Sequence, residues 1–323
     1  MTNWRITALL AALLACASSV AHAQPRYEAQ QRVMPGSGPG VRAFAKSGEL
    51  YYVLSWADRS VLVYNSRMDL VGRLAGTTEG PGRLHGPWDL AVDKAGNVYV
   101  ADRGSNQIKV FSPTGEVLRA ITYESPRSVA VLSTGEIAVV GRPRDHLISL
   151  LDAEGRLLRS IGEPVQVVAR ADLNGFLNTG SLVVDASDNI FVAFSFLPTP
   201  TVRKYDKNGN LLLEFHPSGA RLELAVRDAQ AHLAETVAEG GAGGRGVISG
   251  VGIDPQNGDI WVSCADWIYR FDSRGAHKST FQAVRKGISG SDVGVNVNDI
   301  VFEEERVLIL SHVTGVHQFP LPK

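Results

Sequence analysis

The chain of 323 residues has few cysteines, no surplus of charge and no long hydrophobic run beyond its first residues. Its 32 basic and 33 acidic residues leave a formal net charge of −1. A basic surplus is the usual electrostatic footprint of nucleic-acid binding, so that class of partner is disfavoured. After the first residues, no run reaches the roughly 18 apolar residues that a membrane-spanning helix requires. The sequence therefore indicates neither a nucleic-acid partner nor a membrane span.

The first 23 residues have the features of a secretory signal peptide. Arg5 is their one charge, an apolar run covers residues 6–15, and Ala21-His22-Ala23 fits an A-x-A cleavage site. We therefore expect an exported protein, periplasmic or extracellular, whose mature chain starts at Gln24. A membrane anchor or a buried helix is the alternative interpretation of this stretch.

The chain contains two cysteines, Cys16 and Cys264. Cleavage after Ala23 would leave Cys264 alone, so no intrachain disulfide could form. Its place at the end of a predicted strand indicates a small apolar filler rather than a nucleophile. Cys16 follows Leu-Leu-Ala, which resembles a bacterial lipobox; lipidation there is a second alternative, although Leu fits the second position of that pattern poorly.

Residues 86–121 carry a pattern that the rest of the chain repeats. Turn residues divide the stretch into four short predicted strands: 89–92, 97–101, 107–111 and 116–121. A four-stranded unit of this size cannot bury both faces alone, so it must stack against copies of itself. Five further registers follow the same pattern: 41–76, 126–162, 178–215, 247–281 and 297–323. The sequence therefore predicts an all-β, six-bladed β-propeller of four-stranded antiparallel blades.

A hairpin turn between the last two strands of each unit is the most regular mark of the repeat. A large apolar residue, a small polar one, two variable residues and Gly recur at 111–115, 151–155, 205–209 and 271–275, with a weaker copy at 64–68 that ends in Met68. Gly takes the left-handed conformation of such a turn without steric cost. Five copies make coincidence an unsatisfactory explanation.

The sixth register lacks its outermost strand. It supplies strands at 299–302, 307–310 and 315–319, after which the chain ends. An open edge is a liability that folded proteins avoid. We therefore predict that residues 26–34 close the last blade. The expected organisation is a signal peptide at 1–23, a linker with the closing strand at 24–40 and one propeller domain at 41–323.

One insertion interrupts the repeat, and residues 218–239 are predicted to form a helix. Its apolar residues share one face, Ser218 is the expected N-cap, and the glycine-rich residues 240–246 end it. The stripe consists of Leu222, Val226, Ala229, Leu233 and Val237. Three interpretations stay open: a helix packed on the rim, a lid over the channel hinged by the glycines, or a docking helix for a partner.

The repeat resembles that of the NHL proteins, a family of six-bladed β-propellers. The likeness is carried by Pro87-Trp-Asp-Leu-Ala-Val-Asp, Gly96-Asn-Val-Tyr-Val-Ala-Asp-Arg and Ile108-Lys-Val-Phe-Ser-Pro-Thr-Gly. It is strong in the second unit, fair in the third and degenerate elsewhere. The resemblance implies six blades around a channel, with ligands bound at one mouth. It implies no single activity, because this fold hosts binding proteins, lyases and lactone hydrolases.

Catalytic propellers similar to this family hold a metal ion over the channel. The lyases among them place histidines where the inner strands begin, but the corresponding residues here are Trp88, Arg127, Gly180, Ser249 and Asn298. The lactonase pattern needs a Glu, an Asn and an Asp; Asn298 and Asp266 are candidates, but no first-blade Glu starts a strand. We expect no cofactor, with an oxygen-rich calcium site as the open alternative. The sequence also contains no nucleophile elbow, HExxH motif or phosphate-binding loop.

The candidate ligand-binding residues are those at the ends of inner strands and in the loops that follow. They are Trp88, Arg103, Arg127, Arg142, Asp266, Trp267, Asn298 and His312. Arginines beside a Trp are suited to a carboxylate or a sugar. The alternative is that Arg103 and Arg142 tie neighbouring blades together.

These residues lead to a functional hypothesis with two alternatives. The first is a monomeric, exported binding or scaffold module for a small anionic, glycan or peptide ligand at the channel mouth. A metal-dependent lyase or lactone hydrolase that uses the same mouth is the second. A scaffold that binds a protein partner through its rim and the inserted helix is the third. The sequence favours binding over catalysis.

Overall fold

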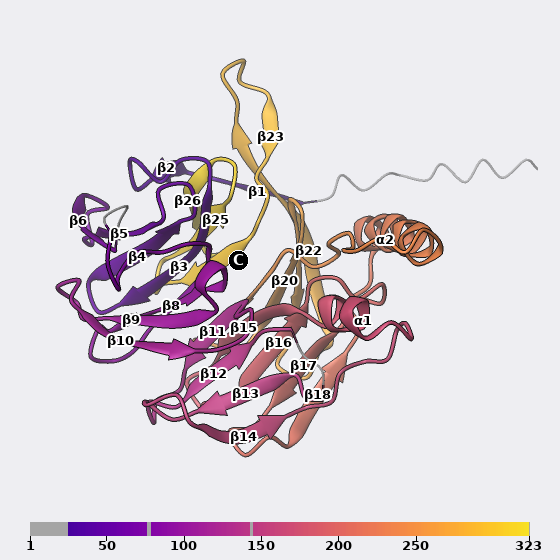
Figure 1. Cartoon of the computed structure of the whole chain (residues 1–323). Coiled ribbons are helices and arrows are strands. Elements are labelled where there is room, and N and C mark those ends of the chain that lie inside the picture. Colours follow the sequence, from indigo (N-terminus) through magenta and orange to yellow (C-terminus); the bar gives the residue numbers. More distant parts are fainter. Residues whose placement is uncertain (1–24, 76–78, 143–144, 323) are drawn as a thin grey trace, which may run out of the picture.

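The β-sheets of the protein are arranged in a ring (Figure 1). Their innermost strands surround a central channel. A computed structural model describes residues 25–75, 79–142 and 145–322. Their strands form six sheets, five with four strands and one with six. The predicted all-β, six-bladed β-propeller is therefore confirmed. The expected signal peptide at residues 1–23 lies outside the described residues and stays a prediction.

In the first three blades each strand pairs with the next, from the channel outward. The first blade contains β3 (Val41–Ser47), β4 (Leu50–Ser55), β5 (Ser60–Tyr64) and β6 (Leu70–Leu74). The second contains β7 (Pro87–Val92), β8 (Val98–Asp102), β9 (Gln107–Phe111) and β10 (Val117–Thr122). The third contains β11 (Ser128–Val131), β12 (Ile137–Val140), β13 (Ile148–Leu151) and β14 (Leu157–Ile161). The strands predicted for residues 86–121 agree with these bounds to within two residues.

The last three blades follow the same order with additions at the edge. The fourth contains β15 (Gly180–Val184), β16 (Ile190–Phe194), β17 (Val202–Tyr205) and β18 (Leu211–Phe215). The fifth contains β19 (Gly250–Ile253), β20 (Ile260–Cys264), β21 (Trp267–Phe271) and β22 (His277–Lys286). The sixth has β24 (Asp299–Phe302), β25 (Arg306–Ser311) and β26 (Gly315–Pro320) from this part of the chain. β22 also pairs with β23 (Asp292–Gly294), and this hairpin projects from the ring (Figure 1).

The N-terminal segment closes the ring, as predicted, but it does so with two strands. β2 (Gln31–Val33) pairs antiparallel with β26 and completes the sixth blade. β1 (Arg26–Glu28) pairs parallel with β22 of the fifth blade. The change of sheet falls between Ala29 and Gln30, because Ala29 N donates to Val284 O and Gln30 N to Gln318 O. The start of the chain therefore ties two blades together.

Each pair of neighbouring blades encloses its own apolar core, and six such clusters complete the circle. Trp261, fully buried between the fifth and sixth blades, contacts Phe281 and Phe302 edge-on. The predicted hairpin glycines on the rim all have positive φ, between 82° and 94°, at 115, 155, 209 and 275; Met68 takes the same conformation at 67°.

Two helices are inserted between blades. α2 (Ala220–Ala238) is the predicted helix, and it packs on the fifth blade through Leu222 and Ala229. The expected Ser218 cap is wrong: Gly219 is the N-cap residue, and no side chain caps the helix. α1 (Ala171–Leu177), between the third and fourth blades, was not predicted. Its sequence is too short to show a helical period, and it lies outside the repeat.

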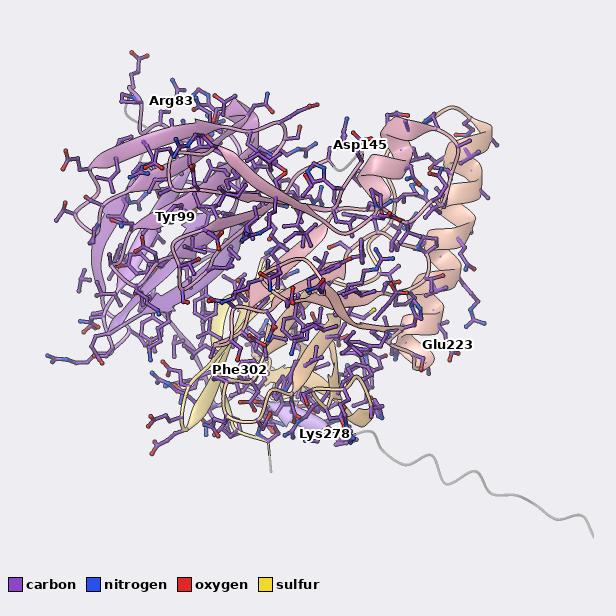
Figure 2. The ribbon with its side chains drawn as sticks, turned by 90° about the horizontal axis from the view of Figure 1, so that it is seen from below. Arg83, Tyr99, Asp145, Glu223, Lys278 and Phe302 are labelled. Atoms are coloured by element: carbon purple, nitrogen blue, oxygen red, sulfur yellow. The ribbon has the colours of Figure 1, made fainter. Side chains whose placement is uncertain are left out.

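The two helices lie side by side at the edge of the ring, and Glu223 marks the first turn of α2 in Figure 2. The Arg170 side chain, just before α1, donates to Gly241 O in the loop after α2. In the described ranges, neither helix is long and apolar enough to cross a membrane.

Candidate functional site

All six innermost strands begin at one mouth of the channel, which we call the arginine mouth. Equivalent positions at these strand starts line a single cavity of about 960 Å³, and they hold Arg42, Trp88, Arg127, Gly180, Ser249 and Asn298. Since strands alternate in direction within a blade, the connections between blades and the loops between second and third strands reach the same mouth. α1 and α2 lie in two of these connections.

Three guanidinium groups gather around the indole ring of Trp88. The Cζ atoms of Arg42, Arg127 and Arg103 lie 3.8, 4.5 and 5.5 Å from the ring centroid. An aromatic face attracts a guanidinium through the π surfaces of both groups, so the in-plane N–H donors stay free for another partner. We call Arg42, Arg103 and Arg127 the arginine cluster.

Two phenylalanine rings also contact Arg127. Its Cζ atom lies 4.8 Å from the ring centroid of Phe196, in the loop after β16, and 5.7 Å from that of Phe176 on α1. The two phenylalanine rings are 4.6 Å apart. The inserted α1 therefore takes part in the site, because its Phe176 packs against Phe196 and both rings contact Arg127.

The arginine cluster has no acidic counter-charge in the part of the chain that the structure describes. None of its three guanidiniums forms an ion pair or a hydrogen bond with a carboxylate there. The opposite mouth differs: Lys46 pairs with Glu303 at 2.7 Å, and Lys204 lies 3.5 Å from Asp185. Unpaired cations therefore mark one end of the channel.

Burial and repulsion from Arg103 and Arg42 lower the pKa of Arg127 to about 10. Burial and the charge of Arg103 also lower the pKa of Arg42. Guanidinium groups in proteins carry a positive charge at neutral pH, so three like charges are held together here against their mutual repulsion. An anion bound at this mouth would relieve that repulsion.

His312 and Asn298 brace the main chain beside the cluster. Asn298 Oδ1 accepts a hydrogen bond from His312 N at 3.0 Å, and His312 Nε2 donates to Arg42 O at 3.2 Å. Burial lowers the pKa of His312, and the charge of Arg42 adds to this effect. His312 is therefore neutral at pH 7, and both side chains already use polar atoms within the fold.

Two carboxyl groups line the channel beneath the arginine cluster and join neighbouring blades. Asp89 accepts hydrogen bonds from Ser128 Oγ and Val129 N of the third blade, and Asp299 accepts one from Phe44 N of the first blade at 2.9 Å. Burial raises the pKa of Asp89 to about 6. Burial, and the charge of Asp89, raise the pKa of Asp299 to about 7.

The structure brings five of the eight candidate residues to the arginine mouth. Trp88, Arg127, Asn298 and His312 line the cavity, and Arg103 contacts Trp88 from the short helix η1 (Arg103–Ser105). The contact of Arg103 with Trp88 lies within its own blade. These placements do not test whether the residues bind a ligand.

The other three candidates lie elsewhere. Asp266 and Trp267 border a separate small groove beside α2, where Arg221 lies over the Trp267 ring. Asp266 Oδ2 there accepts a hydrogen bond from Gln282 Nε2 at 2.7 Å. Arg142 is exposed and does not line the cavity. The loop between β20 and β21 has its predicted place in the repeat. Because α2 packs beside this loop, Asp266 and Trp267 border the groove next to α2 and not the channel.

Three residues of the site were not predicted from the sequence: Arg42, Phe176 and Phe196. Arg42 was within reach, because it occupies in β3 the position that Trp88 occupies in β7. Phe196 and Phe176 carry no such signal, since one lies in a variable loop and the other in an insertion.

The arginine mouth does not suit a metal ion. Among the described residues, no three His, Cys, Asp or Glu side chains are grouped so that they could hold one. Three guanidiniums would also repel a cation. The free thiol of Cys264 is buried in the core between the fourth and fifth blades, and burial raises its pKa to about 11. It has the properties of a filler rather than of a nucleophile.

Comparison with known proteins identifies the repeat. The family model named NHL repeat matches residues 84–111. NHL repeat-containing protein 3 of Homo sapiens is 37% identical over 89 residues, which are 26% of this chain and 25% of that protein. The E3 ubiquitin-protein ligase TRIM71 of Rattus norvegicus is 51% identical over 37 residues, which are 12% of this chain and 4% of the ligase. The chain thus spans a quarter or less of these relatives.

A solved structure supports the same fold over a longer stretch. Virginiamycin B lyase from Staphylococcus aureus superposes with a TM-score of 0.57 at 10% identity, over 90% of this chain and 98% of the lyase. At such low identity the likeness shows the fold alone. The chain therefore carries an NHL repeat and has a six-bladed β-propeller fold.

Proposed function

We propose that this NHL-type propeller is a binding module whose ligand is an anionic molecule held at the arginine mouth. One observation carries the proposal: Arg42, Arg103 and Arg127 meet around Trp88 without an acidic partner in the described chain. Grouping like charges costs free energy, and a bound anion offsets that cost with charge-assisted hydrogen bonds. Export through residues 1–23 belongs to the same proposal.

Charge, rather than ring stacking, is the proposed basis of recognition. A glycan would need an open aromatic face, and the Trp88 ring is already contacted by guanidiniums at 3.8 and 4.5 Å. An anionic group instead meets N–H donors that these contacts leave free. Among small anionic, glycan and peptide ligands, the geometry therefore supports the anionic class.

A metal-dependent lyase or lactone hydrolase has less support. Such an enzyme needs metal ligands at the mouth, and the strand starts there carry Arg42, Trp88 and Arg127. The likeness to a lyase concerns the fold, which hosts many functions. A role in binding a protein partner through the rim is compatible with the fold, but no specific contact in the structure favours it.

The proposal is tested by calorimetric titration of the purified protein with acetate, succinate and citrate at low salt. We expect at least one of these anions to bind, and added salt to weaken it. Arg127→Gln should weaken binding at least tenfold, because it removes one charged partner. Arg274→Gln is the matched control, since that side chain is 88% exposed in a rim turn. The proposal is wrong if none of the anions binds, or if Arg127→Gln binds as well as the wild type.

A further inference from the structure

The channel changes its chemistry from one end to the other. Its wall consists of residues on the six innermost strands, in levels about 3.3 Å apart. Arg42, Trp88 and Arg127 form the first level, and Arg103 contacts Trp88 from η1. The next level carries the carboxyl groups of Asp89 and Asp299 and the hydroxyl of Ser128. A molecule that enters from the arginine mouth therefore meets cations first and hydrogen-bond acceptors second.

Below the carboxyl groups ten residues of the wall are apolar, and charged residues such as Lys46, Asp185, Lys204 and Asp254 line the far mouth. The apolar side chains are Ala45, Ala91, Val92, Ala130, Val131, Val183, Val184, Ile253, Val301 and Phe302. All but Ala130 are half-buried rather than buried, because they border the cavity. The cations at its far end, Lys46 and Lys204, are paired with carboxylates. Water in this half of the channel covers apolar surface, which is unfavourable.

We propose that the ligand is a single-chain anionic amphiphile, with its head at the arginine cluster and an aliphatic tail in the apolar half of the channel. This inference rests on the proposed function of the arginine mouth. Charge complementarity sets the direction: among the described residues that line the channel, Arg42 and Arg127 at the arginine mouth have no carboxylate partner, whereas Lys46 and Lys204 at the far end are paired. The tail displaces water from apolar walls, and its burial adds free energy of binding in proportion to its length.

The carboxyl groups of Asp89 and Asp299, between the arginine cluster and the apolar walls, set a third requirement for the ligand. Asp299 accepts two hydrogen bonds from the wall, from Phe44 N and Ile300 N, and a carboxyl group keeps further acceptor positions whether or not it is protonated. A ligand with an N–H or O–H donor next to its head can use the remaining positions. The ligand class is therefore an acylated amino acid or a compound with the same order of anion, donor and tail.

The dimensions agree with a tail of medium length. Trp88 and Val92 are four residues apart on β7, which corresponds to about 13 Å along the channel. The cavity of about 960 Å³ is continuous from the arginine cluster to Phe302. An acyl chain can thus leave the first level and reach the apolar walls without a rearrangement of the blades.

The test is a calorimetric titration of the full chain with N-acetylglycine and its butanoyl, hexanoyl and octanoyl homologues, each below its micelle concentration. We expect the affinity to rise about fourfold per added methylene, the factor that corresponds to ~0.8 kcal/mol. Octyl phosphate serves as a second arm: tighter binding than that of the octanoyl compound would assign a phosphate head to the same amphiphile, and weaker binding a carboxylate head.

Two substitutions in the apolar half locate the tail. Val131→Asp should abolish the dependence on chain length, because it places a charged group in the wall that contacts the tail. Val131→Thr keeps the shape of the side chain and should weaken the dependence of affinity on chain length. This variant serves as the test if Val131→Asp folds poorly. Val71→Asp is the control, since Val71 is 55% exposed on β6 at the outer edge.

The outcomes separate this inference from the proposed function. If all chain lengths bind equally and Arg127→Gln abolishes their binding, the mouth binds anions and the amphiphile is wrong. If no member of the series binds and acetate, succinate and citrate also fail, both proposals are wrong. A chain-length dependence that Val131→Asp leaves intact would place the tail outside the channel and overturn the inference.

Discussion

At the scale of single residues, adjacent residues of the channel wall have different roles: one positions the cations and the next joins two blades. Trp88 gathers three guanidiniums, and Asp89, the next residue, joins the second blade to the third through Ser128 and Val129. Asp299 does the same between the sixth and first blades through Phe44. The cations at the mouth are therefore placed above two carboxyl groups whose pKa values are raised to about 6 and about 7.

The raised pKa of Asp299 predicts a dependence of stability on pH. The folded state holds this proton up to about pH 7, whereas the unfolded chain releases it near pH 4. The stabilisation from this group is therefore complete below pH 4 and is lost as the pH rises through 7. The side chain of the Asp299→Asn variant is neutral at every pH, so the variant does not lose this stabilisation as the pH rises. Between pH 5 and 8, we expect the unfolding free energy of the variant to improve relative to the wild type by about 2 kcal/mol.

Urea denaturation of both proteins at the two pH values measures this difference. Taking the difference removes the contributions of groups that do not interact with Asp299, including His317, whose pKa burial lowers to about 4. A difference between wild type and variant that is the same at pH 5 and pH 8 would show that Asp299 titrates normally in the folded protein.

The sequence predicts site residues where the repeat places them and fails where an insertion decides. Trp88, Arg127 and Asn298 were found because a fixed register assigns them to strand starts. Phe176 could not be found, because its position depends on how α1 packs against Phe196. Trp267 was placed at the channel by register, whereas it lies beside α2 and Arg221. Tertiary packing of the two insertions was the missing information.

At the scale of elements, α2 resembles a rim helix more than a free lid. Leu222 is 1% exposed in the core between the fourth and fifth blades, and its backbone amide donates to Tyr269 Oη at 3.2 Å. Gly219 allows the helix to start there: its φ is 153°, and a Cβ atom would lie 2.5 Å from the Tyr269 ring. The start of α2 is therefore fixed to β21, and opening as a rigid lid would break this core.

A pair of substitutions tests how firmly α2 is held. Leu222→Ala should lower the unfolding free energy by about 2–4 kcal/mol, because it leaves a cavity in the core. Leu224→Ala is the matched control; that side chain is 48% exposed on the same turn, so its effect should stay within about 0.5 kcal/mol. Thermal or urea unfolding gives both values. Equal small effects would mean that α2 is detached from the blade in solution.

At the scale of the whole molecule, the ring is held by six similar interfaces, and the last two depend on the start of the chain. Met34 is fully buried between the sixth and first blades with Leu308 and Leu310. Tyr27 fills the interface between the fifth and sixth blades, where it stacks on Phe319 at 4.7 Å. The missing strand of the sixth register made this closure predictable. The division into β1 and β2 was not, because three-residue strands carry no period.

The closure predicts that a short truncation has a large effect. A chain that starts at Pro35 lacks Tyr27, Val33 and Met34, and each buried side chain contributes about 1.5–3 kcal/mol. It also exposes the edges of β22 and β26, which invites association. Compared with a chain that starts at Pro25, we expect the melting temperature to fall by at least about 10 °C, since 1 kcal/mol shifts it by about 2–4 °C in domains of 150–250 residues. If the truncated chain aggregates before it melts, Met34→Ala in the longer chain is measured in its place. This substitution should lower the melting temperature by about a third as much as the truncation. Identical melting curves for the two chains would show that the ring closes without its first two strands.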